Sequence, residues 1–166
     1  LNNSTVHIAL VQLLNHELTE AHQSLQKALS MVDQSNSVYL SRLRFYITMV
    51  SICEALINAQ KTILNNAMKE LLQLISNIEK LLKVEQRTVI QVADLHCQLA
   101  GVHAAFACLY FRDQALLKGM YHVHKCKGHV EMVGHVYPSL LDEDYSDDLH
   151  LDLCADYLLG CGGFHF

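Results

Sequence analysis

The chain has 166 residues, of which 51% are hydrophobic and 17% are charged, and it contains a single proline. It is therefore too apolar for a disordered chain and long enough to bury a sizeable core. The net charge of −5 comes without a basic stripe, which argues against direct nucleic-acid binding, and no apolar run reaches the roughly 18–20 residues of a membrane span.

Two helices are predicted in the first 32 residues. Apolar side chains from Val6 to Leu14 form the first, and a stripe at spacings of three and four residues forms the second over residues 18–32. The polar run 33–37 then predicts a turn, because it offers several residues that can cap a helix.

A buried helix and a one-sided helix follow. From Val38 to about Ile63 the helix would be apolar on nearly every side, which is typical of a helix enclosed by its neighbours. Asn65 and Asn66 predict a break. Beyond it, a one-sided stripe is expected from Ala67, Met68, Leu71, Leu72, Ile75, Ile78 and Leu82.

The same order returns in the next segment. A polar connection at 83–88 leads into a second helix that is apolar nearly all round, from Thr88 to about Arg112, and a shorter helix is predicted from Asp113 to about Val123. The alternation predicts an all-α fold of antiparallel helical hairpins stacked as a superhelix. A closed up-down helix bundle is the alternative.

Residues 8–33 resemble a tetratricopeptide (TPR) unit. Ala21, Leu25 and Ala28 match the small, large and small positions of its second helix, and small residues there let two helices cross closely. Ile8 and Ala9 stand where its first helix carries a large and a small residue.

The resemblance weakens along the chain. Gln12 replaces the usual aromatic residue, Asp33 stands where the family often has proline, and the later pairs are longer than the standard repeat. This layout is similar to degenerate TPR arrays such as those of the Mau-type cohesin-loading subunits. The resemblance implies a TPR-like superhelical groove that binds a peptide or wraps a partner chain, in a subunit of a larger complex such as a cohesin loader.

No motif of an enzyme active site is found. The phosphate-binding, nucleophile-elbow and zinc-protease patterns are all missing from the sequence. We therefore predict a non-enzymatic protein–protein interaction scaffold. Its candidate partner-binding residues are the polar residues on otherwise apolar helices, namely Arg42, Arg44, Gln91, Asp94 and Gln98.

A histidine-rich segment near residues 122–135 offers an alternative function, a helical bundle with a zinc site. His122, Cys126 and His129 lie at i, i+4 and i+7, on one face if the segment is helical, and both residue types bind zinc. The competing interpretation is a polar helix end or loop that binds no metal. The primary prediction includes no cofactor.

Other histidines and the cysteines are interpreted as packing residues. His96 and His103 are seven residues apart, so they share a face of a buried helix. Cys53, Cys97 and Cys108 lie in apolar helical segments, where a free thiol behaves as a small hydrophobic group. A core of this size needs no disulfide framework, which predicts an intracellular setting, cytoplasmic or nuclear.

The end of the chain is expected to be distinct from the helical domain of residues 1–136. Residues 138–166 hold seven acidic residues and no Lys or Arg, interspersed with leucines. We predict an acidic and apolar tail over 137–166, either solvated or docked on a basic or helical partner. Because the chain begins without Met, we also expect it to be a piece of a longer array or a processed product.

Overall fold

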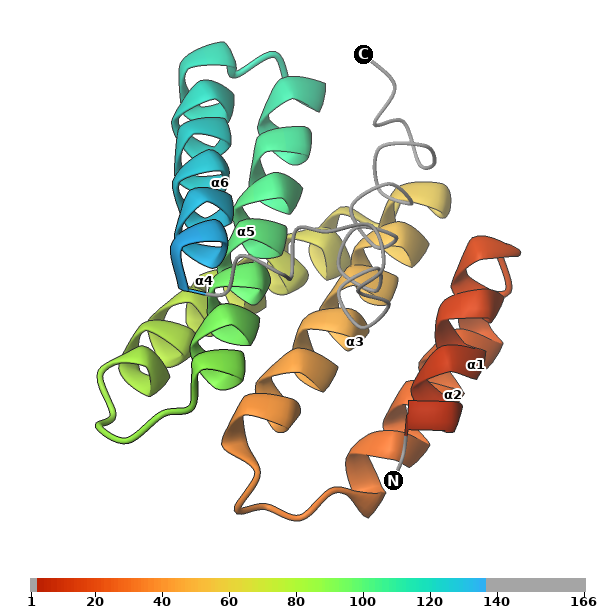
Figure 1. Ribbon diagram of the computed structural model, residues 1–166. Coiled ribbons are helices and arrows are strands. Elements are labelled where there is room, and N and C mark those ends of the chain that lie inside the picture. Colours follow the sequence, from red (N-terminus) through yellow and green to blue (C-terminus); the bar gives the residue numbers. More distant parts are fainter. Residues whose placement is uncertain (1–2, 137–166) are drawn as a thin grey trace.

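The computed structural model describes residues 3–136, and these form six α-helices and no strand (Figure 1). The helices are α1 Asn3–Leu14, α2 Leu18–Met31, α3 Ser37–Ile57, α4 Lys61–Leu82, α5 Val89–Arg112 and α6 Leu116–Val136. The predicted all-α class is confirmed for this part of the chain. The predicted tail at 137–166 lies outside the described residues.

Helices α3 and α5 lie at the centre of the packing. Each helix contacts the next one along the chain, and α3 also contacts α5. The largest fully buried side chains include Phe45 and Tyr46 of α3 and Phe106 of α5. By contrast, α2 and α4 bury a single stripe each, which confirms the predicted alternation of enclosed and one-sided helices.

Several residues of the segment that resembles a TPR unit are buried. Ala21, Leu25 and Ala28 of α2 are buried in the core, and so is Ala9 of α1. Ile8 differs, because 54% of it is exposed.

Three turns of identical hydrogen bonding join α1 to α2, α3 to α4 and α5 to α6. Each spans three residues, 15–17, 58–60 and 113–115. In each, the three successive N–H groups donate to the carbonyls four, three and five residues earlier, at 2.8–3.4 Å. The central residues His16, Ala59 and Gln114 all adopt a left-handed conformation, with φ of 63°, 52° and 62°. The chain therefore repeats a turn in space without repeating its sequence.

Two predicted boundaries were wrong. The break falls at residues 58–60 and not at Asn65 and Asn66, which lie inside α4. The bonds of this turn are made by the backbone, so it needs no Gly or Pro to mark it. The last described helix also continues beyond Val123 to Val136, because its inward face packs along the length of α5.

One predicted core residue was also wrong. Leu72 is 58% exposed, and Leu74 lies in the core in its place. The true stripe of α4 runs through Ala67, Leu71, Leu74 and Ile78, with the spacing of four and three residues that one helix face requires.

The expectation that no apolar run reaches the length of a membrane span was wrong for α5. Its 24 residues are long and apolar enough to cross a membrane by length and composition, and 72% of that apolar window is buried inside the fold. Close packing explains part of this burial. A Cβ atom added to Gly101 would lie 2.7 Å from Cζ of Phe45, so the absence of a side chain at Gly101 admits the buried ring from α3.

Candidate functional site

Three of the predicted partner-binding residues form a polar network between α3 and α5. Nε and Nη2 of Arg42 both donate to Oδ1 of Asp94, at 3.1 and 2.8 Å. Nε2 of Gln98, which is fully buried, donates to the same oxygen at 3.1 Å and to the Val38 carbonyl at 3.2 Å. These side chains join the two helices inside the fold, while Oε1 of Gln98 is buried there without a hydrogen-bond partner.

The two other predicted residues have different environments. Gln91 is part of the capping box at the start of α5, where its side chain accepts from the Thr88 N–H and its N–H donates to the Thr88 hydroxyl. Arg44 is exposed and lines two shallow pockets of about 270 and 290 Å³ beside α4. Of the five, Arg44 is the residue best placed to meet a partner.

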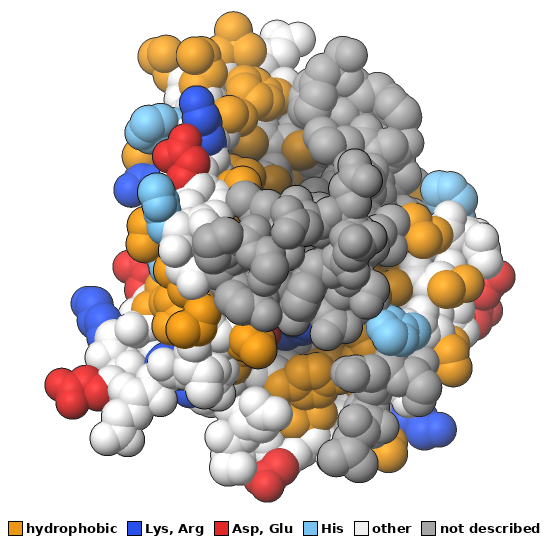
Figure 2. Space-filling view, in the orientation of Figure 1, with side chains coloured by type: hydrophobic (Ala, Val, Ile, Leu, Met, Phe, Trp, Pro, Cys, Tyr) orange, Lys and Arg blue, Asp and Glu red, His pale blue; other side chains and the backbone are white. Residues whose placement is uncertain are grey.

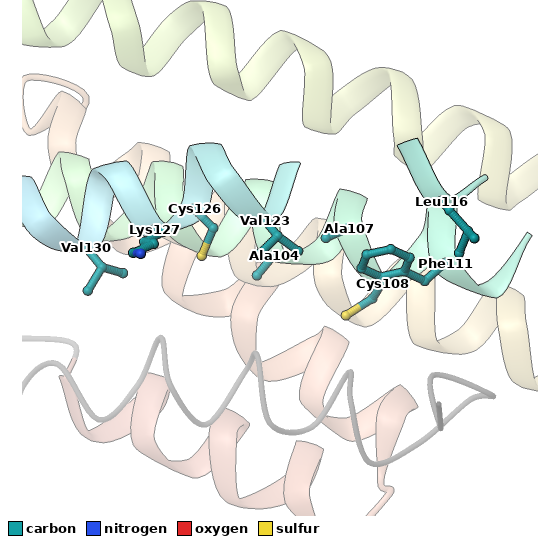
Figure 3. Close-up of a pocket in the computed structure, with 9 residues that line it drawn as sticks. All are labelled: Ala104, Ala107, Cys108, Phe111, Leu116, Val123, Cys126, Lys127 and Val130. Carbon is teal, nitrogen blue, oxygen red and sulfur yellow. The ribbon is translucent and has the colours of Figure 1, made fainter. Parts of the chain in front are cut away.

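A larger apolar groove lies between α5 and α6. Its volume is about 840 Å³, and it is lined by Ala104, Ala107, Cys108, Phe111, Leu116, Val123, Cys126, Lys127 and Val130. Figure 3 shows Val123, Cys126 and Val130 of α6 pointing to the same side of the helix pair as Cys108 of α5. Lys127 contributes the charged group of this lining.

Apolar side chains continue from the groove onto the surface of α6. Leu116, Leu117 and Met120 are 63%, 85% and 63% exposed. Figure 2 shows hydrophobic side chains gathered at the end of the molecule where α6 begins, with Lys and His side chains nearby. Exposed apolar surface next to an apolar groove is typical of a binding site.

The two thiols in the groove are protonated at neutral pH. Burial, followed by the nearby Cys126, raises the pKa of Cys108 to about 11, and burial also raises the pKa of Cys126. Because the thiolate is the nucleophilic form, neither group is set up for covalent chemistry. The prediction that Cys108 serves packing agrees with its position.

The other flank of the same helix pair carries four histidines. His122 and His129 of α6 face His103 and His96 of α5. Nδ1 of His103 lies 2.9 Å from Nδ1 of His122, and Nδ1 of His96 lies 3.0 Å from Nδ1 of His129. The rings of His103 and His129 also stack, with centroids 5.6 Å apart, so the two pairs form one cluster, which we call the histidine seam.

Burial keeps the histidine seam neutral. It is the first cause that lowers the pKa of all four side chains, and it lowers the pKa of His103 to about 4 together with Coulombic repulsion from His122, His129 and Lys125. The rings of Phe106 and Tyr110 stack on His122 at 4.9 and 5.4 Å between centroids. His122 therefore lies against two aromatic rings, and the burial of His103 and half-burial of the other three imidazoles leave less water to solvate a charge than in free solution.

The predicted zinc ligands point in different directions. His122 and His129 each pair with a histidine of α5, whereas Cys126 lines the apolar groove on the other flank. Over residues 3–136, no three His, Cys, Asp or Glu side chains converge as a metal site would need. The helical spacing of these residues was correctly recognised, but a metal also requires their atoms to meet at one point.

Both features of the α5–α6 pair were missed in the sequence because their residues come from two separate segments. One signal was present. The inward positions of α6, counted from Ala115 just before it, recur at alternating spacings of four and three, at Gly119, His122, Cys126, His129, Val133 and Val136. Such a repeat marks a helix that packs along a partner helix, although histidine and glycine hide it from an apolar pattern.

Comparison with known proteins adds no relative. No family model, no curated protein and no solved structure matches this chain.

Proposed function

We propose that this chain is a non-enzymatic, TPR-like helical scaffold that binds an acidic and apolar segment of a partner protein in the groove between α5 and α6. The observation that carries the proposal is the groove itself, an open hollow of about 840 Å³ whose lining is apolar apart from one lysine. Burying such a surface under a partner is favourable by roughly 25 cal/mol per Å² of apolar area, before the costs of association.

The charge of α6 indicates the chemistry of the partner. This helix carries Lys118, Lys125 and Lys127 and a single acidic residue, Glu131. Lys127 lies in the groove lining, while the ammonium groups of Lys118 and Lys125 lie over the rings of Tyr110 and Tyr121. A partner segment with carboxylates next to leucine-like side chains would complement both the charge and the apolar surface.

The scaffold architecture is supported by the repeated turn and by the helix contacts. Three helix pairs close with one hydrogen-bonding pattern, and α3 contacts α5 across the pairs. Stacked antiparallel hairpins in a TPR-like superhelix would produce both features. In that architecture α1, α3 and α5 are the first helices of successive pairs.

The chemistry of the described residues favours binding over catalysis. The two groove thiols are protonated, and the histidines of the seam hydrogen-bond to each other instead of to a carboxylate. A catalytic histidine would need an orienting acid and a nucleophile within hydrogen-bond reach.

The proposal is tested by peptide binding. Fluorescence anisotropy would compare three labelled peptides of about 15 residues: one with leucines and acids, one with the acids replaced by lysines, and one with the leucines replaced by serines. We expect the first to bind and the other two to bind at least about tenfold more weakly, since each loses one half of the complementarity.

Variants would locate the binding. Val123→Asp places a charge in the groove and should weaken binding at least about tenfold, and Lys127→Glu should weaken it about fivefold. Lys69→Glu, on the exposed face of α4, is the matched control and should leave binding unchanged. The proposal is wrong if the lysine peptide binds equally well or if the groove variants bind like the control. Light scattering at the same concentrations shows whether a second copy of the chain occupies the groove instead.

A further inference from the structure

We propose that the histidine seam is a proton-responsive clasp that holds α6 against α5 while its imidazoles are neutral and releases α6 when they take up protons. The release would open the groove, because α6 forms one wall of it. The clasp itself stands on the geometry of His96, His103, His122 and His129. Its effect on partner binding rests on the proposed function.

Proton counting shows why the seam responds to pH. A hydrogen bond between two Nδ1 atoms needs one proton, so one imidazole donates its Nδ1–H and the other accepts. One added proton per pair leaves this bond in place but introduces a charge. A second added proton puts two N–H donors 2.9–3.0 Å apart, so the bond is lost and two positive charges face each other.

The surroundings provide positive charge and no compensating acid. Lys125 of α6 acts on His103 and His129, and the pairs act on each other, since His122 and His129 both disfavour a charge on His103. On the α3 side of α5, Arg42 and Asp94 are paired with each other. Among the described residues of α3, α4, α5 and α6, no carboxylate is among the groups that shift the pKa of the four histidines.

The seam and the groove share the same two helices. On α6, His122 and His129 face the seam, while Val123 and Val130, each the next residue in the chain, line the groove. A displacement of α6 away from α5 therefore disrupts both flanks together. Opening must also break the packing of α6 along α5, in which Gly119 and Val133 are the buried residues of α6 in the described structure.

The sign and size of the response follow from the pKa values. The pKa of His103 is about 4 in the closed state and 6.5 for an unperturbed histidine, so the open state binds protons first as the pH falls. Stability of the closed state is complete above about pH 7 and decreases through the interval down to about pH 4. Proton uptake by His103 alone should make the equilibrium constant for opening about tenfold larger at about pH 5.5 than at about pH 7.5.

Hydrogen exchange of the full chain measures this opening. Exchange would be followed at about pH 7.5 and about pH 5.5 with a metal chelator present, and protection factors corrected for the intrinsic pH dependence would be compared between α6 and α4. We expect α6 protection to decrease at least about tenfold relative to α4 at the lower pH. Equal changes in the two helices would overturn the clasp.

Histidine variants assign the response. The pH response of α6 should be about tenfold smaller in His103→Gln, whereas His124→Gln, which changes an exposed histidine of α6, should keep all of it. The ratio between the two pH values is taken within each variant, so a general loss of stability does not affect the comparison. If His103→Gln does not fold, imidazole nitrogen NMR of the unaltered chain still decides: a His103 pKa near 6.5 refutes the clasp.

Failure of the clasp and failure of the proposed function remain separable. If the acidic and apolar peptide binds at about pH 7.5 but α6 protection does not respond to pH, the clasp is wrong and the binding function stands. If α6 responds to pH but the peptide binds at neither pH, the clasp stands and the proposed partner chemistry is wrong.

Discussion

Replacing Gly101 by alanine tests how closely α3 and α5 are packed. The added Cβ would lie 2.7 Å from Cζ of Phe45 and 3.3 and 3.4 Å from its two Cε atoms. Phe45 is fully buried, so its ring cannot turn outward to make room. Either the ring must tilt within the core or the two helices must separate.

The magnitude follows from two opposing effects. Overpacking a core by one methyl group costs typically about 1–3 kcal/mol. Alanine gains about 1 kcal/mol over glycine in a helix interior. We therefore expect Gly101→Ala to lower the free energy of unfolding by about 0–2 kcal/mol. Gly128→Ala is the matched control, because its Cβ would meet nothing within 4 Å, and we expect it to raise this free energy by about 0.5–1 kcal/mol.

Urea denaturation followed by circular dichroism measures both variants under one condition. The expected separation between them is about 2 kcal/mol, or several degrees in Tm for a chain of this size. The packing argument would be refuted if Gly101→Ala were as stable as Gly128→Ala, since the higher helix propensity of alanine would then explain the stability of both variants.

Two further predictions concern single contacts. Asp94→Ala leaves the Arg42 guanidinium partly buried beside α5 without its carboxylate partner and should destabilise the fold by about 2–3 kcal/mol. Arg42→Met combined with Asp94→Ala should cost less than the sum of the two single changes. A strictly additive double-mutant cycle, measured by urea denaturation, would contradict this. Ala59→Gly should raise the free energy of unfolding by up to about 1 kcal/mol, because glycine adopts the left-handed φ of 52° without strain. A loss of stability measured for Ala59→Gly in the same assay would show that this turn is not strained.

The functional predictions depend on one element, the α5–α6 pair. Its groove flank should bind an acidic and apolar segment, and its histidine flank should control how firmly the pair is closed. Hydrogen exchange of α6 and peptide binding can both be measured on the same protein under the same conditions. The response of α6 to pH and the binding of peptides to its groove can therefore be compared directly.

The sequence by itself determined the helical class and the alternation of enclosed and one-sided helices. Both depend on the spacing of apolar residues within one segment, as in the stripe Ala21, Leu25 and Ala28. It also placed His96 and His103 on one helix face, and His122 and His129 on another, because a spacing of seven residues is nearly two turns.

Only the tertiary structure decided which of these faces meet. The turn at 58–60 is stabilised by backbone hydrogen bonds that leave no mark in residue type, so the sequence pattern placed the break several residues too late. The polar residues Arg42, Asp94 and Gln98 were predicted to face a partner, and they bond to each other because α3 crosses α5 at that point. The histidine seam has the same origin: periodicity assigns a residue to a face, but the packing of two helices determines what that face contacts.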